Sequence, residues 1–235
     1  SLALPGVIFL FKETILIYRK KIITILGISF VSLMINLVLN FLLDFLSKKN
    51  FLTVDASGSF NFGLFFYVSI SIFSAVVAAI FQTWSYLALI YAIKNSQENI
   101  SAKKSYLLGW NNILSYWWIS FLMGIIFLGG LFLLIIPGFI FSIWFLFAPI
   151  ILVVENLKGM SALLKSKDYV KGKLIEVAWR LFAISVIFIA FFVLMFSIIF
   201  FTFSPTSRNT IFSVGSTIFS FIVFPFIIIY YFLIY

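Results

Sequence analysis

The chain has 235 residues, of which 64% are hydrophobic and only 10% are charged. Soluble domains carry about a quarter charged residues, so this composition excludes a water-facing globular surface and fits a protein embedded in lipid. The sequence contains no Cys and no His, which excludes disulfides, thiol chemistry, the usual zinc sites and imidazole acid–base catalysis.

Six apolar stretches are long enough to cross a hydrocarbon core of about 30 Å, which takes roughly 20 helical residues. Backbone groups in lipid must be paired within their own segment, so we expect each stretch to be a helix. The predicted fold class is therefore all-α, a polytopic transmembrane bundle that forms one domain over residues 1–235. The predicted spans are residues 22–46, 63–93, 113–135, 138–154, 177–203 and 210–235.

Three shorter stretches, residues 5–20, 96–110 and 157–174, each precede a pair of spans. Each contains a tyrosine near its end, at Tyr18, Tyr106 or Tyr169. We interpret the chain as three copies of one unit, an interfacial amphipathic helix followed by a helical hairpin. Chance similarity within an apolar, low-complexity chain is the alternative.

A polar stripe runs along the first span. Its members, spaced four residues apart and so stacked on one helical face, are Ser32, Asn36, Asn40 and Asp44. Such groups seldom face lipid, because lipid leaves them unpaired. The stripe either lines a path for an ion or solute, with Asp44 at its outer mouth, or forms hydrogen bonds between helices. Gln82 on the second span is the predicted partner of the two asparagines.

The third and fourth spans are joined tightly around Pro137 and Gly138. Proline cannot continue the helical hydrogen bonds and glycine permits a positive φ, so we predict the hairpin turn at these two residues. The alternative is a turn at Gly129-Gly130, although paired glycines inside a span more often mark close helix packing. Pro149 and Pro225 are expected to kink the fourth and sixth spans. The small residues of the sixth span, Ser213, Gly215, Ser216, Thr217 and Ser220, favour packing between helices.

The segment 157–174 has an apolar stripe beside a lysine-rich rim, and the stripe consists of Met160, Leu163, Leu164, Val170 and Leu174. A helix of this kind lies in the headgroup plane of a membrane. The candidate contacts to anionic headgroups are Lys158, Lys165, Lys167, Lys171, Lys173 and Arg180. The alternative is an ordinary connecting helix packed on the bundle.

Basic residues also predict the orientation of the chain. The net charge is +9, and all Lys and Arg residues except Lys48, Lys49 and Arg208 fall on one side of the predicted spans. Because short basic loops stay in the cytoplasm, both termini are predicted to be cytoplasmic in a multi-pass protein of the cell membrane. Anionic lipid is the expected partner of these charges, and nucleic acid is not, because the basic residues lie between apolar runs.

Several features recur in an order that resembles a known family. They are Leu-Leu-Ile-Ile-Pro-Gly at 133–138, Pro149, Glu155, and Ala162-Leu163…Ser166…Tyr169-Val170-Lys171-Gly172. The pattern resembles the bacterial membrane proteins related to the glycerophosphoryl diester phosphodiesterase membrane domain and the YciC-type inner-membrane proteins. The resemblance implies a six-helix membrane module. The phosphodiesterase activity of some relatives resides in a separate domain with metal-binding acids and histidines, so it does not carry over.

The sequence contains no phosphate loop, nucleophile elbow or ligand pair on a helix, and we expect no catalytic residue, metal or cofactor. The function predicted from the sequence is a non-enzymatic integral membrane module that organises lipid or partner proteins, including further copies of itself. The alternative is a small transporter or channel subunit with a polar path along Ser32, Asn36, Asn40 and Asp44.

Overall fold

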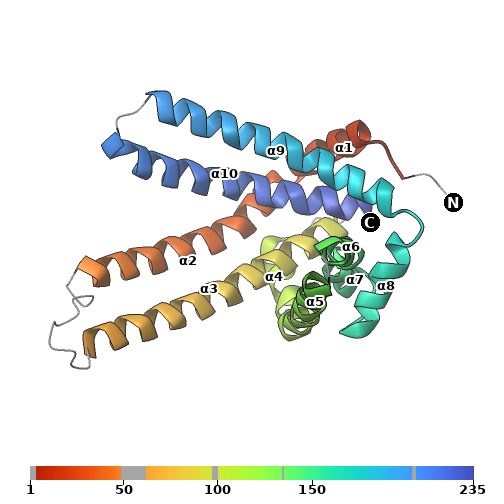
Figure 1. Ribbon diagram of the computed structural model, residues 1–235, viewed down its shortest axis with the longest axis horizontal. Helices are drawn as coiled ribbons and strands as arrows, with labels where there is room; N and C mark the ends of the chain where they lie inside the picture. The colour runs from red at the N-terminus through yellow and green to blue at the C-terminus, as the bar shows by residue number, and fades with distance from the viewer. Residues whose placement is uncertain (1–3, 49–61, 97–99, 134, 203–204) are drawn as a thin grey trace.

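The computed structural model describes residues 4–48, 62–96, 100–133, 135–202 and 205–235, and these residues form helices and no strand (Figure 1). The helices are α1 (Val7–Lys20), α2 (Ile22–Lys48), α3 (Phe62–Lys94), α4 (Ala102–Trp110), α5 (Ile113–Leu133), α6 (Ile135–Phe145), α7 (Ala148–Val154), α8 (Met160–Val170), α9 (Leu174–Thr202) and α10 (Pro205–Ile234). Six helical stretches are long and apolar enough to cross a membrane: α2, α3, α5, α6 with α7, α9 and α10. The all-α, multi-pass membrane architecture is confirmed.

The helices group into three units. In each unit a short helix precedes a hairpin of two packed helices: α1 before α2 and α3, α4 before α5 and α6, and α8 before α9 and α10. This order confirms the predicted repeat of short helix and hairpin. Several boundaries differ from the prediction, most of all the beginnings of α4 at Ala102 and of α10 at Pro205.

Each short helix packs on the hairpin of the preceding unit. α4 packs on α3, α8 packs on α6 and α7, and α1 packs on α10, so the three units close into a ring. A small hydroxyl residue is fully buried in each short helix, at Thr14, Ser105 and Ser166. Small side chains let helix backbones approach closely, which explains why these positions carry Ser and Thr.

The buried core lies at the end of the molecule that holds the short helices. It contains residues 87–90 of α3, residues 148–153 of α7 and residues 228–230 of α10. Away from this end, the α2–α3 hairpin and the α9–α10 hairpin diverge, and α5 is seen nearly end-on (Figure 1). The diverging halves expose large apolar side chains such as Phe41, Phe73 and Phe201, as lipid-facing helices do.

The turn between the third and fourth spans is not at the predicted position. α5 ends at Leu133 and α6 begins at Ile135, so Pro137 and Gly138 lie in the first turn of a helix. Proline is tolerated there because the first N–H groups of a helix have no partner within it. The alternative turn at Gly129-Gly130 is also wrong, because both residues lie inside α5.

Glycine at 130 and 138 is instead required by the contact between the two helices. A Cβ atom placed on Gly130 would lie 2.9 Å from the Gly138 Cα, and a Cβ on Gly138 would lie 2.9 Å from Leu131 Cδ2. The close-packing role expected for paired glycines is therefore confirmed at Gly130.

The fourth span is broken where Pro149 predicted a kink. α6 ends at Phe145, and α7 begins at Ala148 with Pro149 in its first turn. Proline has no N–H to donate back along the helix, so the backbone near it needs other partners. Ser166 of α8 supplies them: its hydroxyl donates to the Trp144 carbonyl (2.6 Å) and accepts from the Phe147 N–H (3.2 Å). α8 is thereby fixed to the break.

Candidate functional site

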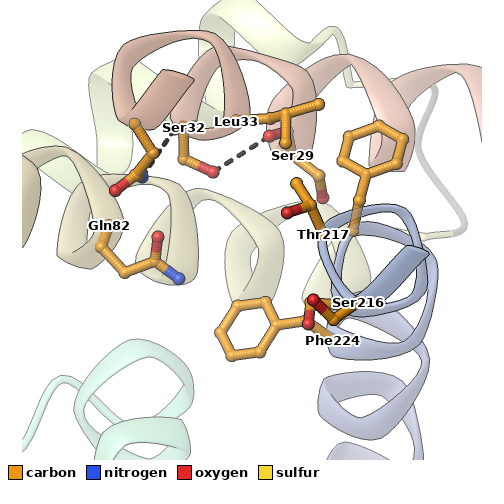
Figure 2. A pocket seen from close by; sticks show the side chains of 10 residues that line it. Ser29, Ser32, Leu33, Gln82, Ser216, Thr217 and Phe224 are labelled. Carbon is orange, nitrogen blue, oxygen red and sulfur yellow. Dashed lines mark hydrogen bonds between the residues drawn. The ribbon is translucent and has the colours of Figure 1, made fainter. Parts of the chain in front are cut away.

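A polar cavity of about 350 Å³ lies between α2, α3 and α10 (Figure 2). We call it the polar chamber. Its wall is made by Ser29, Ser32, Leu33 and Asn36 of α2, Gln82 of α3, and Ser216, Thr217, Ser220, Phe221 and Phe224 of α10. Hydroxyl and carboxamide groups therefore meet inside a bundle whose other helix faces are apolar, and none of the lining residues is charged.

The α2 wall results from the four-residue spacing of its polar residues. Ser32 Oγ donates to the Ser29 carbonyl (2.9 Å), and Asn36 Nδ2 donates to the Ser32 carbonyl (2.7 Å). These bonds use donors of Ser32 and Asn36, so the side-chain oxygens of both residues remain as acceptors on the chamber wall.

Two chamber residues have unused hydrogen-bonding capacity. Ser29 is only 5% exposed, and its Oγ has no hydrogen-bond partner among the described residues. Gln82 extends from α3 into the space that Ser32 and Thr217 also face, and its carboxamide forms no hydrogen bond with a described residue (Figure 2). Burying an unpaired hydroxyl costs about 1–3 kcal/mol, and Ser74 of α3 carries this cost as well.

The predicted stripe is only partly assembled into this site. Ser32 and Asn36 line the chamber with Gln82, whereas Asn40 and Asp44 lie farther along α2 and are exposed. Asn40 Nδ2 donates to the Asn36 carbonyl (2.8 Å) within the same helix. The predicted bond between Gln82 and an asparagine is wrong, because no hydrogen bond among the described residues joins Gln82 to Asn36 or Asn40.

The α10 wall was missed by sequence reasoning, which interpreted Ser216, Thr217 and Ser220 as packing residues. Gly215 does pack, with its Cβ position 3.8 Å from Met195 and Ile199 of α9, whereas the three hydroxyl residues line the chamber. The four-residue spacing of Ser216 and Ser220 is the same signal that revealed the stripe on α2.

The chamber is closed toward the core end of the molecule. One turn beyond it, each lining helix continues into fully buried residues: Ile25 and Ile28 of α2, residues 87–90 of α3, and Ile228 and Ile229 of α10. In the other direction α10 diverges from α2 and α3 (Figure 1). Buried residues of all three lining helices therefore bound the chamber at the core end.

Arg180 is not a contact for lipid headgroups. Its side chain is buried, and Nε donates to the Pro5 carbonyl (2.8 Å) while Nη2 donates to the Leu4 carbonyl (2.7 Å). Nη1 donates to the Glu176 carbonyl (2.7 Å), and the Tyr230 hydroxyl donates to the Arg180 carbonyl (3.1 Å). The predicted role is corrected: Arg180 joins α9 and α10 to the segment before α1.

The lysines of the α8 region divide into exposed and half-buried residues. Lys158, Lys165 and Lys171 are exposed, and Lys165 Nζ lies 3.8 Å from a Glu155 carboxylate oxygen. Lys167 and Lys173 are half-buried, and Lys167 Nζ lies 4.7 Å from the centre of the Trp144 ring.

The predicted apolar stripe of α8 is split between two environments. Leu163 and Val170 are fully buried against the bundle, whereas Met160 and Leu164 are exposed. Leu174 is half-buried and begins α9. Packing on the bundle therefore accounts for part of the stripe, as the connecting-helix alternative requires.

The residues of the family-like pattern meet around α8. Ser166 fixes the break near Pro149, the Tyr169 hydroxyl donates to the Ile234 carbonyl (2.7 Å), and Glu155 accepts a hydrogen bond from the Tyr235 hydroxyl. Each contact holds helices together, so the pattern is structural. Within the described part of the chain, no group of acids could hold a metal ion. The chain matches no protein-family model, and no curated protein or solved structure is significantly similar to it.

Proposed function

We propose that this protein is a non-enzymatic module that binds a small uncharged solute in the polar chamber, as part of a transport function. The observation that carries the proposal is that uncharged polar side chains from α2, α3 and α10 line one cavity, among them Asn36, Gln82 and Thr217. A solute with hydroxyl or amide groups satisfies such donors and acceptors together.

The lining selects the ligand by charge and shape. The chamber has no charged residue, and its hydroxyl and carboxamide groups can both donate and accept hydrogen bonds, which favours an uncharged polar ligand. Leu33, Phe221 and Phe224 form an apolar part of the wall. A ligand with one polar edge and one apolar face fits this division.

We also propose that the sealed end of the chamber faces the cytoplasm of a bacterial cell. Basic residues of α1, α4 and α8 lie at the core end of the molecule, which the positive-inside rule favours on the cytoplasmic side. In this orientation the chamber opens toward the outside, and the short helices lie at the cytoplasmic interface.

Thiol labelling tests whether the chamber is an aqueous site. The chain has no native Cys, so Ser32→Cys introduces one thiol into the chamber and Ser185→Cys introduces one on the exposed surface of α9. Methanethiosulfonate reagents attack thiolates, which form in water and not in lipid. In proteoliposomes, Ser32→Cys should react with a small neutral reagent much faster than Ser185→Cys does. Equal, slow labelling of the two thiols would show that the chamber is dry and refute the proposal.

A second candidate function is the organisation of lipid or partner proteins at the cytoplasmic face. It is favoured by the exposure of Lys158, Lys165 and Lys171 beside the exposed apolar residues Met160 and Leu164. It also agrees with the proposed kinship to the diester phosphodiesterase membrane-domain proteins. Replacing the three lysines by Gln should weaken binding of the purified protein to anionic vesicles without changing the labelling of Ser32→Cys.

A further inference from the structure

A second, chemically different cavity lies between α2, α3 and α4. Its volume is about 270 Å³, and it is lined by Val31, Trp84, Lys103, Tyr106 and Leu107. We call it the α4 groove. Val31 and Leu107 are exposed, so the groove opens to the surroundings of the bundle at the end where the short helices lie.

The aromatic walls of the groove are apolar because their polar atoms have protein partners. Trp84 Nε1 donates to the Tyr106 carbonyl (2.7 Å), and the Tyr106 hydroxyl donates to the Ile28 carbonyl (2.7 Å). The Trp84 and Tyr106 rings meet edge to face with their centres 5.0 Å apart. These contacts fix both rings, so the groove is preformed and presents ring faces and methyl groups.

The rim of the groove carries positive charge. Lys103 lines it and Lys104 is adjacent, and neither forms an ion pair with an acidic residue in the described part of the chain. Both lie in the first turn of α4, where the helix dipole adds partial positive charge. An apolar slot with cations at one end complements an amphiphile that has an anionic head.

We propose that the α4 groove binds an anionic phospholipid of the surrounding leaflet, with an acyl chain along Trp84 and Leu107 and the phosphate beside Lys103. Trp84 and Trp110 place aromatic rings at this level, with centres 5.0 Å apart, as is usual where a membrane protein meets headgroups. The site does not depend on the polar chamber, which lies on the other side of α2 and α3 and has uncharged polar walls.

The test compares lipid retention by the purified full-length chain. Detergent-solubilised protein is exchanged into mixed phosphatidylglycerol and phosphatidylcholine, and retained lipids are counted by native mass spectrometry. Lys103→Gln should lower phosphatidylglycerol affinity about fivefold and leave phosphatidylcholine unchanged. Val31→Phe, which fills the groove, should lower retention of both lipids. Lys12→Gln is the matched control, because it removes an exposed lysine on α1 that lines no part of the groove.

Two results would overturn the proposal. If Lys12→Gln weakens phosphatidylglycerol binding as much as Lys103→Gln does, binding depends on the net charge of the protein and not on the groove. If Lys103→Gln and Val31→Phe both retain lipid as the wild type does, the groove holds no lipid. Thermal melting of each variant near the wild-type temperature shows that the comparison is made between folded proteins.

Discussion

The guanidinium of Arg180 donates to the carbonyl oxygens of Leu4 and Pro5, although 176 and 175 residues separate them in the chain. These bonds hold the segment before α1 against the beginning of α9. Because α1 also packs on α10, the first unit is joined to the third at two places. Arg180 therefore helps to close the ring of three units.

Replacing Arg180 by Leu should destabilise the fold by about 2–4 kcal/mol, because the carbonyl groups of Leu4, Pro5 and Glu176 lose the donors that the buried guanidinium supplies. Thermal melting in detergent, followed by tryptophan fluorescence, measures the loss. Lys171→Leu is the control, since Lys171 is exposed and removal of its charge should change melting little. Equal melting of the two variants would contradict the role assigned to Arg180.

The α5–α6 hairpin offers a test with two adjacent glycines. Gly130→Ala should destabilise the protein by about 1–3 kcal/mol, because the new Cβ would lie 2.8 Å from Phe141 Cδ2 and 2.9 Å from Gly138 Cα. Gly129→Ala should be neutral or slightly stabilising, because nothing lies within 4 Å of its Cβ position and Ala favours the helix. Melting temperatures in the opposite order would show that the two helices are farther apart.

Tyr106 ties α4 to the first hairpin. Tyr106→Phe should cost about 1–2 kcal/mol, since its hydroxyl bonds both the Ile28 carbonyl and Ser85. Tyr18→Phe should cost less, because the Tyr18 hydroxyl makes one longer bond to the Ile222 carbonyl (3.2 Å). Burial raises the pKa of Tyr106 above 10.0. The bond should therefore contribute fully below pH 10 and be lost as the pH rises through the higher folded value, in a melting-temperature profile against pH.

The helices and their order followed from the sequence, because each span and each lysine-bearing short helix is encoded by local composition. Contacts between segments that are distant in the chain could not be predicted from the sequence. Arg180 has the same local surroundings as a headgroup-binding residue, and only the fold brings the Leu4 and Pro5 carbonyls to it. Likewise, Pro137 predicted a turn near the end of α5 but at the wrong residues, because proline is compatible with both a turn and the first turn of a helix.

The sequence indicated only some of the residues that line the chamber. Ser32, Asn36 and Gln82 stood out because they are polar residues within apolar spans. Ser216, Thr217 and Ser220 did not, because small residues have a common packing role in membrane helices. Which of the two roles applies depends on how α10 is turned toward α2, and that is a tertiary property.

The proposed orientation is tested by single cysteines at Ser101 and Ser161, both of which are exposed. From outside intact cells, an impermeant maleimide should label neither, and both should react after permeabilisation. Ser166 is unsuitable because it is fully buried, so a cysteine there would not react with the maleimide from either side of the membrane. A cysteine at Ser57, expected to react from outside, lies beyond the described residues. Labelling of Ser101→Cys in intact cells would reverse the orientation and place the mouth of the chamber in the cytoplasm.

Ser29 and Ser166 form a matched pair for the last prediction, because both are buried serines and only Ser166 has partners. Ser166→Ala should cost about 1–3 kcal/mol, since the Trp144 carbonyl and the Phe147 N–H at the break of the fourth span both lose a bond. Ser29→Ala should be neutral or stabilising in ligand-free protein, because it removes a buried hydroxyl that has no protein partner. If melting shows Ser29→Ala to be as destabilising as Ser166→Ala, then the hydroxyl is bonded within the protein, and it is not available to a solute. If Ser29→Ala melts at or above the wild-type temperature, the hydroxyl contributes nothing to the stability of the fold.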